Sequence, residues 1–195
     1  MIGGVVLAAG EGRRFGGPKQ LAELGGRPLV EHALAAMFAV PAIERIVVVL
    51  GAQAGRIRDH ADLGGVEVVV AGDWSEGISA SLRAGVAVLA EAEAVVVLLA
   101  DQPLITPQVI AAVLDRGDSR APAARATFGG APGHPVVIKR ELFGDVARLE
   151  GDAGARDLLE LAGVATVECG HLASAHDVDT REDLQAIGGE VGSRR

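Results

Sequence analysis

The sequence has a single cysteine, Cys169, so no internal disulfide bond can form. A lone thiol is typical of proteins from a reducing compartment. No apolar run approaches the roughly 18 residues that a membrane span requires. No basic segment precedes the first apolar run, as it would in a secretory signal peptide. These absences predict a cytoplasmic protein with no membrane partner.

Aromatic residues make up only 3% of the chain and tyrosine is absent, so valine, leucine, isoleucine and alanine must fill the core. Positive charge is also scarce, and the formal net charge of −8 argues against nucleic acid as the main partner. The length of 195 residues and the 49% hydrophobic content suit one sizeable core. We therefore expect a single domain over residues 1–187 and a polar tail over 188–195.

Four apolar runs are continuous rather than alternating, which predicts strands that are buried on both faces of a parallel sheet. Helical segments separate these runs, and two of the segments have proline in their first turn. The expected strands are 2–8, 45–50, 66–71 and 94–100, and the expected helices are 28–38, 53–60, 79–90 and 107–116. This alternation predicts an α/β protein with a three-layer, doubly wound, mostly parallel sheet.

The second half of the chain has shorter elements. Residues 121–128 and 134–139 are strand candidates, and the glycine- and proline-rich segment 129–133 joins them. This pattern is typical of an antiparallel pair. We expect a small antiparallel insertion that supplies one wall of the cleft. After it we expect helices near 141–149 and 153–162, a strand at 165–168 and a closing helix from Thr180.

The loop after the first apolar run is rich in glycine and in positive charge. Within ten positions it contains four glycines and three basic residues, namely Gly10, Gly12, Gly16, Gly17, Arg13, Arg14 and Lys19. A polyphosphate requires backbone N–H groups that no Cβ atom shields, together with cations that neutralise its charge. The pattern therefore predicts an anion-binding loop, and the alternative is a solvated surface turn.

The spacing in this loop excludes two common phosphate-binding motifs. A P-loop places a hydroxyl residue after its lysine to hold magnesium, whereas Gln20 follows Lys19. A dinucleotide fingerprint requires a small residue where Phe15 stands and an unbroken helix where Pro18 stands. The chain has two lysines against sixteen arginines, so the choice of Lys19 for the end of the loop is informative. A compact ammonium there can act as a point charge on phosphate.

An aspartate follows the fourth apolar run, where a parallel strand reaches the ligand-binding edge of its sheet. Asp101 comes directly after residues 95–100 and before Gln102 and Pro103. Its carboxylate is a hard oxygen ligand that suits Mg2+. We expect Asp101 to face the same ligand as the glycine-rich loop, and the alternative is an ordinary loop or helix-capping aspartate.

The acidic segment, residues 177–183, has two interpretations. In one, Thr180 or Asp179 caps a helix and Asp183 lies in its first turn. In the other, Asp177 or Asp179 is a second carboxylate that faces the same metal and phosphates. The alternation around Val178 does not choose between the two aspartates, so the question stays open at this point.

Two further segments carry candidate binding residues. The hydroxyl groups of Ser79 and Ser81, at the start of a helix, can face an anion or the edge of a base. Alternatively, Ser79 is an N-cap and Trp74 is a core residue. His134 and Asp152, both set among glycine or proline, can contact an acceptor substrate, or serve as a turn residue and a helix N-cap.

Together these motifs resemble the MobA-like nucleotidyltransferases, and within them the molybdenum cofactor cytidylyltransferases. The resemblance covers about residues 2–187. Its blocks are LAAGEGRRFG at 7–16, KQL at 19–21, DWSEG at 73–77, ADQP at 100–103, GHPV at 133–136, GDAGAR at 151–156 and DVDT at 177–180. Many sugar and cofactor nucleotidyltransferases share the first block, whereas the blocks around His134 and Asp152 are more specific.

The resemblance implies a Rossmann-like nucleotidyltransferase fold. It also implies transfer of a nucleoside monophosphate from an NTP to the terminal phosphate of molybdopterin cofactor, with Mg2+ required and pyrophosphate released. The expected catalytic residues are Lys19, Arg14 and Asp101, and the expected metal ligands are Asp101 and Asp179. The expected nucleotide-binding residues are Ala8, Ala9, Gly10, Gly12, Arg13, Lys19, Ser79 and Ser81, and the expected acceptor-binding residues are Gln102, His134 and Asp152.

The expected nucleotide is CTP, because Ala9 and Gln20 resemble the cytidine-selective branch of the family. Two positions depart from the family pattern, namely Ala100, where glycine often precedes the aspartate, and the glycine-rich segment 16–18. A molybdenum enzyme that receives the product is a further expected partner. The alternatives are a guanylyltransferase for the same cofactor, a phospholactate guanylyltransferase, a sugar-1-phosphate nucleotidyltransferase, or a non-catalytic nucleotide-binding chaperone of molybdenum cofactor.

Overall fold

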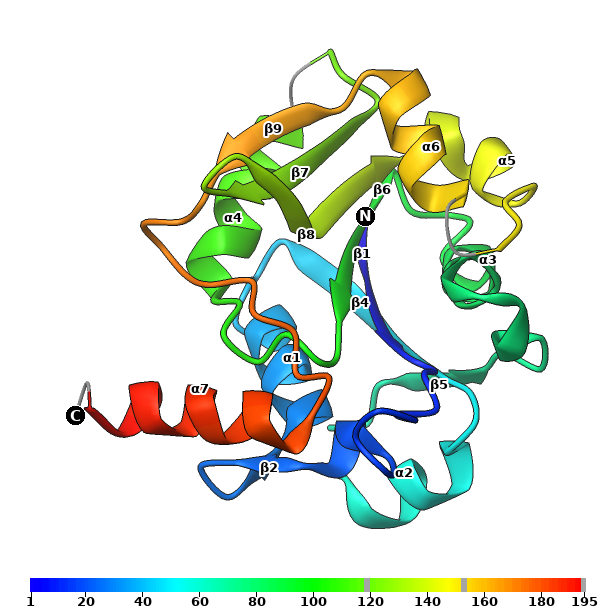
Figure 1. Cartoon of the computed structure of the whole chain (residues 1–195). Coiled ribbons are helices and arrows are strands. Elements are labelled where there is room, and N and C mark those ends of the chain that lie inside the picture. The colour runs from blue at the N-terminus through cyan, green and yellow to red at the C-terminus, as the bar shows by residue number, and fades with distance from the viewer. Residues whose placement is uncertain (118–119, 152–153, 194–195) are drawn as a thin grey trace.

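Seven strands form one sheet in the computed structural model, which describes residues 1–117, 120–151 and 154–193. Their spatial order is β5-β4-β1-β6-β8-β7-β9 (Figure 1). The strands are β1 (Ile2–Ala8), β4 (Ile43–Leu50), β5 (Glu67–Val70), β6 (Ala94–Leu99), β7 (Ala123–Phe128), β8 (Ala131–Lys139) and β9 (Ala165–Glu168). A separate antiparallel pair consists of β2 (Glu23–Leu24) and β3 (Arg27–Pro28).

The strands from the N-terminal half of the chain are parallel. β1 lies between β4 and β6 and runs parallel to both, and β5 runs parallel to β4. Val5 and Val6 at the centre of β1 are fully buried, as a continuous apolar run requires when helices cover both faces of a sheet. The four predicted strands are confirmed to within two residues at each end. Their carboxyl ends share one edge of the sheet.

Helices cover both faces of the sheet, which confirms the predicted three-layer, doubly wound arrangement. One face carries α1 (Leu29–Phe38), α2 (Ala54–His60) and α4 (Pro107–Gly117), and the other carries α3 (Ile78–Val88), α5 (Phe143–Val146) and α6 (Gly154–Ala162). α3 packs closely on the sheet at Gly85, where a Cβ atom would lie 2.6 Å from Val5 Cγ1. This close packing holds the N-terminal end of α3 near the carboxyl end of β1.

The antiparallel insertion expected in the second half is the β7–β8 hairpin, which continues the main sheet. β8 pairs antiparallel with both β6 and β7. The turn is shorter than the predicted linker 129–133, because Gly129 and Gly130 have φ values of +60° and +83° and close a two-residue turn. Residues 131–133 therefore belong to β8. The Glu168 carboxylate accepts hydrogen bonds from the N–H groups of Gly129 and Gly130, at 2.9 and 3.0 Å.

The closing helix α7 (Arg181–Ser193) packs against the loop that follows β1. Its residues Leu184 and Ile187 share a small apolar cluster with Phe15 and Leu24. The helix begins after Thr180 as predicted, and it includes residues 188–193, which we expected to form a polar tail. No pattern in the sequence predicted β2, β3 or the short 3-10 helices η1 (Lys19–Leu21), η2 (Trp74–Glu76) and η3 (Arg140–Leu142). Within the described residues, every helix is too short or too polar to cross a bilayer.

Candidate active site

A cavity of about 540 Å³ lies at the carboxyl ends of β1 and β6. In doubly wound sheets this edge is where ligands bind. The loop after β1 and η1 form part of its wall, and η2 with the first turn of α3 form another part. The lining residues are Leu7, Ala8, Ala9, Gly10, Glu11, Gly12, Arg13, Arg14, Lys19, Gln20, Trp74, Ser75, Gly77, Ile78, Ser81, Leu99, Ala100 and Asp101.

The glycine-rich loop has a fixed shape. Gly12 has a φ of +72°, and a Cβ atom on it would lie 2.0 Å from the Gly17 carbonyl oxygen, so no side chain fits there. The N–H groups of Gly16 and Gly17 donate to the Gly12 carbonyl at 3.0 and 3.3 Å. The buried Gln20 amide donates to the carbonyls of Ala8 and Gly10 at 3.0 and 2.8 Å. The loop is therefore held in place before any ligand arrives.

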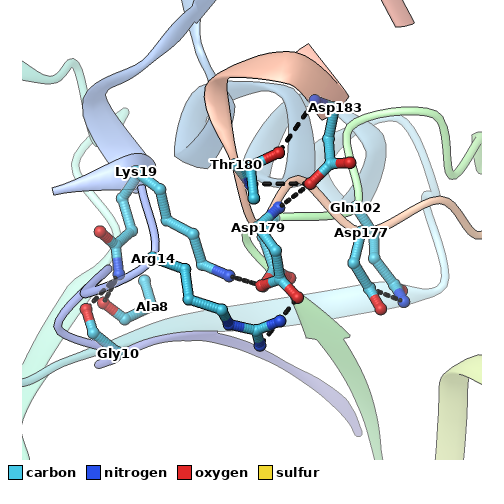
Figure 2. Close-up of polar contacts among 11 residues, drawn as sticks. Ala8, Gly10, Arg14, Lys19, Gln102, Asp177, Asp179, Thr180 and Asp183 are labelled. Carbon is cyan, nitrogen blue, oxygen red and sulfur yellow. Dashed lines mark hydrogen bonds and ion pairs between the residues drawn. The ribbon is translucent and has the colours of Figure 1, made fainter. Parts of the chain in front are cut away.

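Lys19 and the two predicted metal ligands, Asp101 and Asp179, converge beside the glycine-rich loop. Lys19 Nζ lies 2.6 Å from Asp101 Oδ2 and 2.8 Å from Asp179 Oδ1. The second oxygen of Asp179 lies 2.9 Å from Arg14 Nη2, so one carboxylate contacts two cations (Figure 2). The Lys19 and Asp101 side chains keep only 14% and 19% of their surface exposed, so water screens this pair weakly.

Two backbone hydrogen bonds bring the carboxylates together. The Ala100 N–H donates to the Leu7 carbonyl at 3.0 Å, which continues the β1–β6 pairing up to Asp101. The Val178 N–H donates to the Asp101 carbonyl at 2.9 Å, and Val178 is fully buried. The segment that carries Asp179 is thereby fastened to the turn that carries Asp101.

The helix-cap interpretation of the acidic segment is confirmed, for Thr180 and Asp183. Thr180 and Asp183 form the helix cap, because Thr180 Oγ1 accepts from the Asp183 N–H at 3.2 Å and the Asp183 carboxylate accepts from the Thr180 N–H at 2.7 Å. The Asp179 side chain is left to contact Lys19 and Arg14. Asp177 instead accepts a hydrogen bond from Gln102 Nε2 at 2.7 Å (Figure 2).

The charges of the site influence one another. Burial lowers the pKa of Lys19, but the ion pairs with Asp101 and Asp179 outweigh this effect and raise its pKa above the ordinary value. Partial burial raises the pKa of Asp177, the Gln102 hydrogen bond lowers it, and the neighbouring carboxylates of Asp101 and Asp179 raise it further. Lys19 is therefore an ammonium at neutral pH, and it contacts two of the three carboxylates gathered here.

The donor set fits a divalent metal that is shared with a phosphate ligand. Asp101 Oδ1 is buried and has no hydrogen-bond partner, which leaves one carboxylate oxygen available for coordination. Among the described residues, no three histidine, cysteine or acidic side chains form a complete metal cage. Mg2+ sites commonly use one or two carboxylates together with substrate phosphates and water. Asp101 and Asp179 match that description.

The structure brings most of the predicted nucleotide-binding residues to the cavity. Ala8, Ala9, Arg13 and Ser81 all line it, and Arg13 pairs there with Glu11 at 2.6 Å. The placement expected for Ser79 is corrected: it is fully buried in the first turn of α3, and it does not line the cavity.

The three predicted acceptor-binding residues lie outside the main cavity or outside the described residues. Gln102 is buried and holds Asp177 rather than lining the cavity. His134 lines a neighbouring apolar cavity of about 40 Å³, and burial followed by the nearby charge of Arg125 lowers its pKa to about 4. Asp152 lies outside the described residues.

Some residues of the cavity wall were not predicted as site residues. Trp74, for which the sequence left a core position and a site position open, lines the cavity together with Ser75, Gly77 and Ile78. The signal for these positions was the lone tryptophan set among small residues just before a helix. Arg125, close to His134, belonged to no motif, and no pattern in the sequence pointed to it.

The fold and the cavity at the strand ends define an α/β protein of the Rossmann-like nucleotidyltransferase class. The family model described as the MobA-like NTP transferase domain matches residues 4–170. The chain belongs to this family, which confirms the resemblance drawn from its motifs.

Three similar proteins cover nearly the whole chain. It is 36% identical to Nicotine blue oxidoreductase from Paenarthrobacter nicotinovorans, over 95% of this chain and 96% of that protein. A crystal structure of a Mycobacterium tuberculosis Rv0371c homologue from Mycobacterium sp. strain JC1 gives a TM-score of 0.86 at 33% identity, covering 100% of this chain and 98% of that one. Rv0371c from M. tuberculosis in complex with manganese gives a TM-score of 0.82 at 29% identity, covering 96% and 98%.

Proposed function

We propose that this nucleotidyltransferase moves CMP from CTP onto the terminal phosphate of molybdopterin cofactor and releases pyrophosphate. The observation that carries the proposal is the convergence of Lys19, Arg14, Asp101 and Asp179 beside a preformed glycine-rich loop. Cations suited to a triphosphate and carboxylates suited to a metal share one cavity there. This is the arrangement that phosphoryl and nucleotidyl transfer requires.

In this mechanism the chain positions charges rather than moving protons. The N–H groups of the glycine-rich loop, with Lys19 and Arg14, hold the triphosphate and neutralise the negative charge that develops at its α-phosphate. The acceptor phosphate is already an oxyanion, so it needs no strong general base. Its oxygen forms the new bond to the α-phosphorus, and the bond from the α-phosphorus to the pyrophosphate oxygen breaks.

A divalent cation held by Asp101 and Asp179 would neutralise charge on the triphosphate and orient it. The buried, unpartnered Asp101 Oδ1 supports this assignment. So does the manganese complex of Rv0371c, although the cation that this chain uses is proposed here as Mg2+.

The choice of CTP rests on Ala9 and Gln20. Both line the cavity, and Gln20 also ties down the carbonyls of Ala8 and Gly10. Both residues are therefore positioned to influence the loop that we assign to the nucleotide. The cytidine preference itself is carried over from the sequence motif.

The test is pyrophosphate release from CTP, GTP or ATP, each with Mg2+ or Mn2+ and with molybdopterin cofactor as acceptor. We expect release with CTP that depends on both the metal and the acceptor. Faster release with GTP would move the assignment to a guanylyltransferase. Release that requires a sugar 1-phosphate or phospholactate would move it to those transferases. Stoichiometric CTP binding with no release would indicate a nucleotide-binding chaperone.

A second candidate, an oxidoreductase, is favoured by the full-length similarity to Nicotine blue oxidoreductase. The geometry of the glycine-rich loop argues against an oxidoreductase that binds a dinucleotide there. Phe15 is buried in an apolar cluster at the position where a dinucleotide fingerprint needs a small residue, and α1 begins only at Leu29. Oxidation of NADH or NADPH by the purified protein with nicotine blue as the acceptor, followed by absorbance, tests this alternative directly.

A further inference from the structure

His134 lies at the edge of the sheet where ligands bind. Val136 of β8 lies opposite Val97 of β6 in their antiparallel pairing. Two residues further toward the carboxyl end of β6, the same register brings His134 level with Leu99, the last residue of that strand. Leu99 lies opposite Leu7 of β1 and lines the main cavity. His134 therefore belongs to the row of residues that ends the sheet beside the candidate active site.

The small cavity that His134 lines adjoins the main one, because Leu7 and Ile78 line both. Among the described residues, every other side chain of its lining is aliphatic. These are Leu7, Ile78, Leu82, Val97, Val136, Ile138, Leu158 and Leu159. α3 and α6 contribute two each and the sheet contributes the remainder, so the cavity lies between the sheet and two helices. A mostly apolar lining with few polar groups is typical of small-molecule sites.

His134 has hydrogen-bonding capacity that the fold does not use. Burial, and after it the charge of Arg125, lower its pKa to about 4, so the ring is neutral at pH 7. A neutral imidazole has one donor nitrogen and one acceptor nitrogen. Within the described residues neither nitrogen has a hydrogen-bond partner. The ring therefore offers one donor and one acceptor to a ligand in this cavity.

The lining decides which part of an acceptor fits the small cavity. No charged side chain of the described residues lines it, so burying a phosphate there would cost much free energy. An uncharged nitrogen heteroaromatic ring loses far less, since its faces are apolar and its edge can pair with the imidazole. The volume of about 40 Å³ has room for roughly three water-sized groups. That space matches one edge of such a ring.

We propose that His134 and the aliphatic cavity around it bind the uncharged pterin ring of the acceptor, with the edge of the ring hydrogen-bonded to His134. The inference rests on the proposed function, because it gives a place to the acceptor of that reaction. The phosphate of the acceptor then extends past Leu7 and Ile78 into the main cavity. Ring recognition and charge neutralisation are thereby divided between two adjoining cavities.

The first test needs no turnover and uses free pterin, which has the ring but no phosphate. A fluorescence titration of pterin should show binding to the protein saturated with CTP and Mn2+. His134→Leu should weaken this binding about tenfold or more, because its hydrogen bonds are lost, and His134→Gln should retain part of the affinity. His171→Leu is the matched control, because His171 is exposed. Equal pterin binding by the wild type and His134→Leu, or none by the wild type, would overturn the inference.

The second test fills the cavity without changing His134. Leu158 is a half-buried residue of α6 that lines the small cavity and not the main one. Leu158→Phe should occupy the space of the ring and weaken pterin binding as His134→Leu does. Calorimetric binding of CTP with Mn2+ should stay unchanged. Pterin affinity equal to that of the wild type would overturn the placement of the ring in this cavity.

Kinetics and stability distinguish a binding role of His134 from a structural one. With molybdopterin cofactor as acceptor, His134→Leu should raise the acceptor KM about tenfold and leave the KM for CTP unchanged. Its thermal midpoint should equal or exceed that of the wild type, because leucine suits an aliphatic lining and no hydrogen bond within the fold is lost. A midpoint several degrees lower, together with a higher KM for CTP, would identify a structural residue and overturn the inference.

The inference and the proposed function fail on different results. Turnover of CTP and molybdopterin cofactor with the same acceptor KM in the wild type and His134→Leu would overturn the inference alone. Absence of pyrophosphate release with molybdopterin cofactor would overturn the proposed function. The pterin titration, which requires no turnover, would still test the cavity.

Discussion

At the scale of single residues, the site depends on side chains whose charges compensate one another. In the proposed mechanism Lys19 neutralises charge on the triphosphate and Asp101 holds the metal, so Lys19→Ala and Asp101→Ala should each lower pyrophosphate release by about 10²–10⁴-fold. Both proteins should still fold, since Asp179 keeps Arg14 when Lys19 is removed and Lys19 keeps Asp179 when Asp101 is removed. Lys139→Ala, which changes the chain's other lysine, is the control. Near-normal release by either site variant would contradict the mechanism.

His134 should make the free energy of unfolding depend on pH in the mildly acidic range. Its pKa is lowered from 6.5 to about 4, so the folded state keeps the ring neutral where the unfolded chain takes up a proton. The free energy of unfolding should therefore fall, by roughly 1–3 kcal/mol, as the pH drops from about 6.5 to about 4. Urea unfolding of the wild type and of His134→Gln at several pH values measures this. His60→Gln, which changes an exposed histidine, is the control. If it removes the pH dependence of the free energy of unfolding as His134→Gln does, the attribution to His134 is wrong.

The sequence was sufficient to predict that Lys19 and Asp101 converge, because a loop and a strand end of one parallel sheet must meet at the same edge. It did not decide between Asp177 and Asp179. Which of the two contacts Lys19 depends on the hydrogen bond from Val178 to the Asp101 carbonyl and on the Gln102 side chain, which hydrogen-bonds to Asp177. Such contacts between distant segments leave no periodic pattern in the sequence.

At the scale of elements, the glycine-rich loop should tolerate substitution unevenly. Gly12→Ala places a Cβ atom 2.0 Å from the Gly17 carbonyl and should abolish CTP binding, because the loop cannot keep its shape. Gly16→Ala is the matched control, since Gly16 also has positive φ, at +82°, but has open space around it. It should cost only about 1 kcal/mol of stability and retain most of the binding. Calorimetry measures CTP binding by both variants. An equal loss of CTP affinity in the two would contradict this account.

The β7–β8 turn should respond to acid through Glu168. Hydrogen bonds from Gly129, Gly130, Gly170 and Thr127 lower the pKa of this carboxyl from 4.5 to about 2. Its stabilising effect should be complete above about pH 4.5 and should decrease as the pH falls toward 2. Glu168→Gln should thus be less stable than the wild type at pH 7, and the difference should narrow at pH 3. Thermal unfolding measures this difference in stability. A difference that stays constant between pH 7 and pH 3 would contradict this role of Glu168.

The predictability of an element followed its own pattern of apolar residues. The four parallel strands β1, β4, β5 and β6 were predicted to within two residues because a continuous apolar run must be covered on both faces. The short β2–β3 pair and the 3-10 helices were missed, since contacts with the rest of the fold hold them and not their own composition. The helical residues 188–193 were missed because glycines and charges there resemble a tail.

At the scale of the whole molecule, we predict that residues 1–187 unfold as one domain. The cores on the two faces of the sheet share the strands β1, β4 and β6, so neither can be lost without exposing the other. Far-UV circular dichroism and the fluorescence of the single tryptophan, Trp74, should give coincident urea transitions. Two separate transitions would show that the second half of the chain is an independent unit.

The contact between Lys19 and Asp179 joins residues 160 positions apart. A ribosome must therefore release the chain at least as far as Asp179 before Lys19 can contact both of its carboxylate partners. A nascent or prematurely terminated chain that ends before Asp179 would contain the glycine-rich loop but lack one of its two paired carboxylates. Synthesis from the N-terminus to the C-terminus thus delays assembly of this cluster until Asp179 has been made and has left the ribosome.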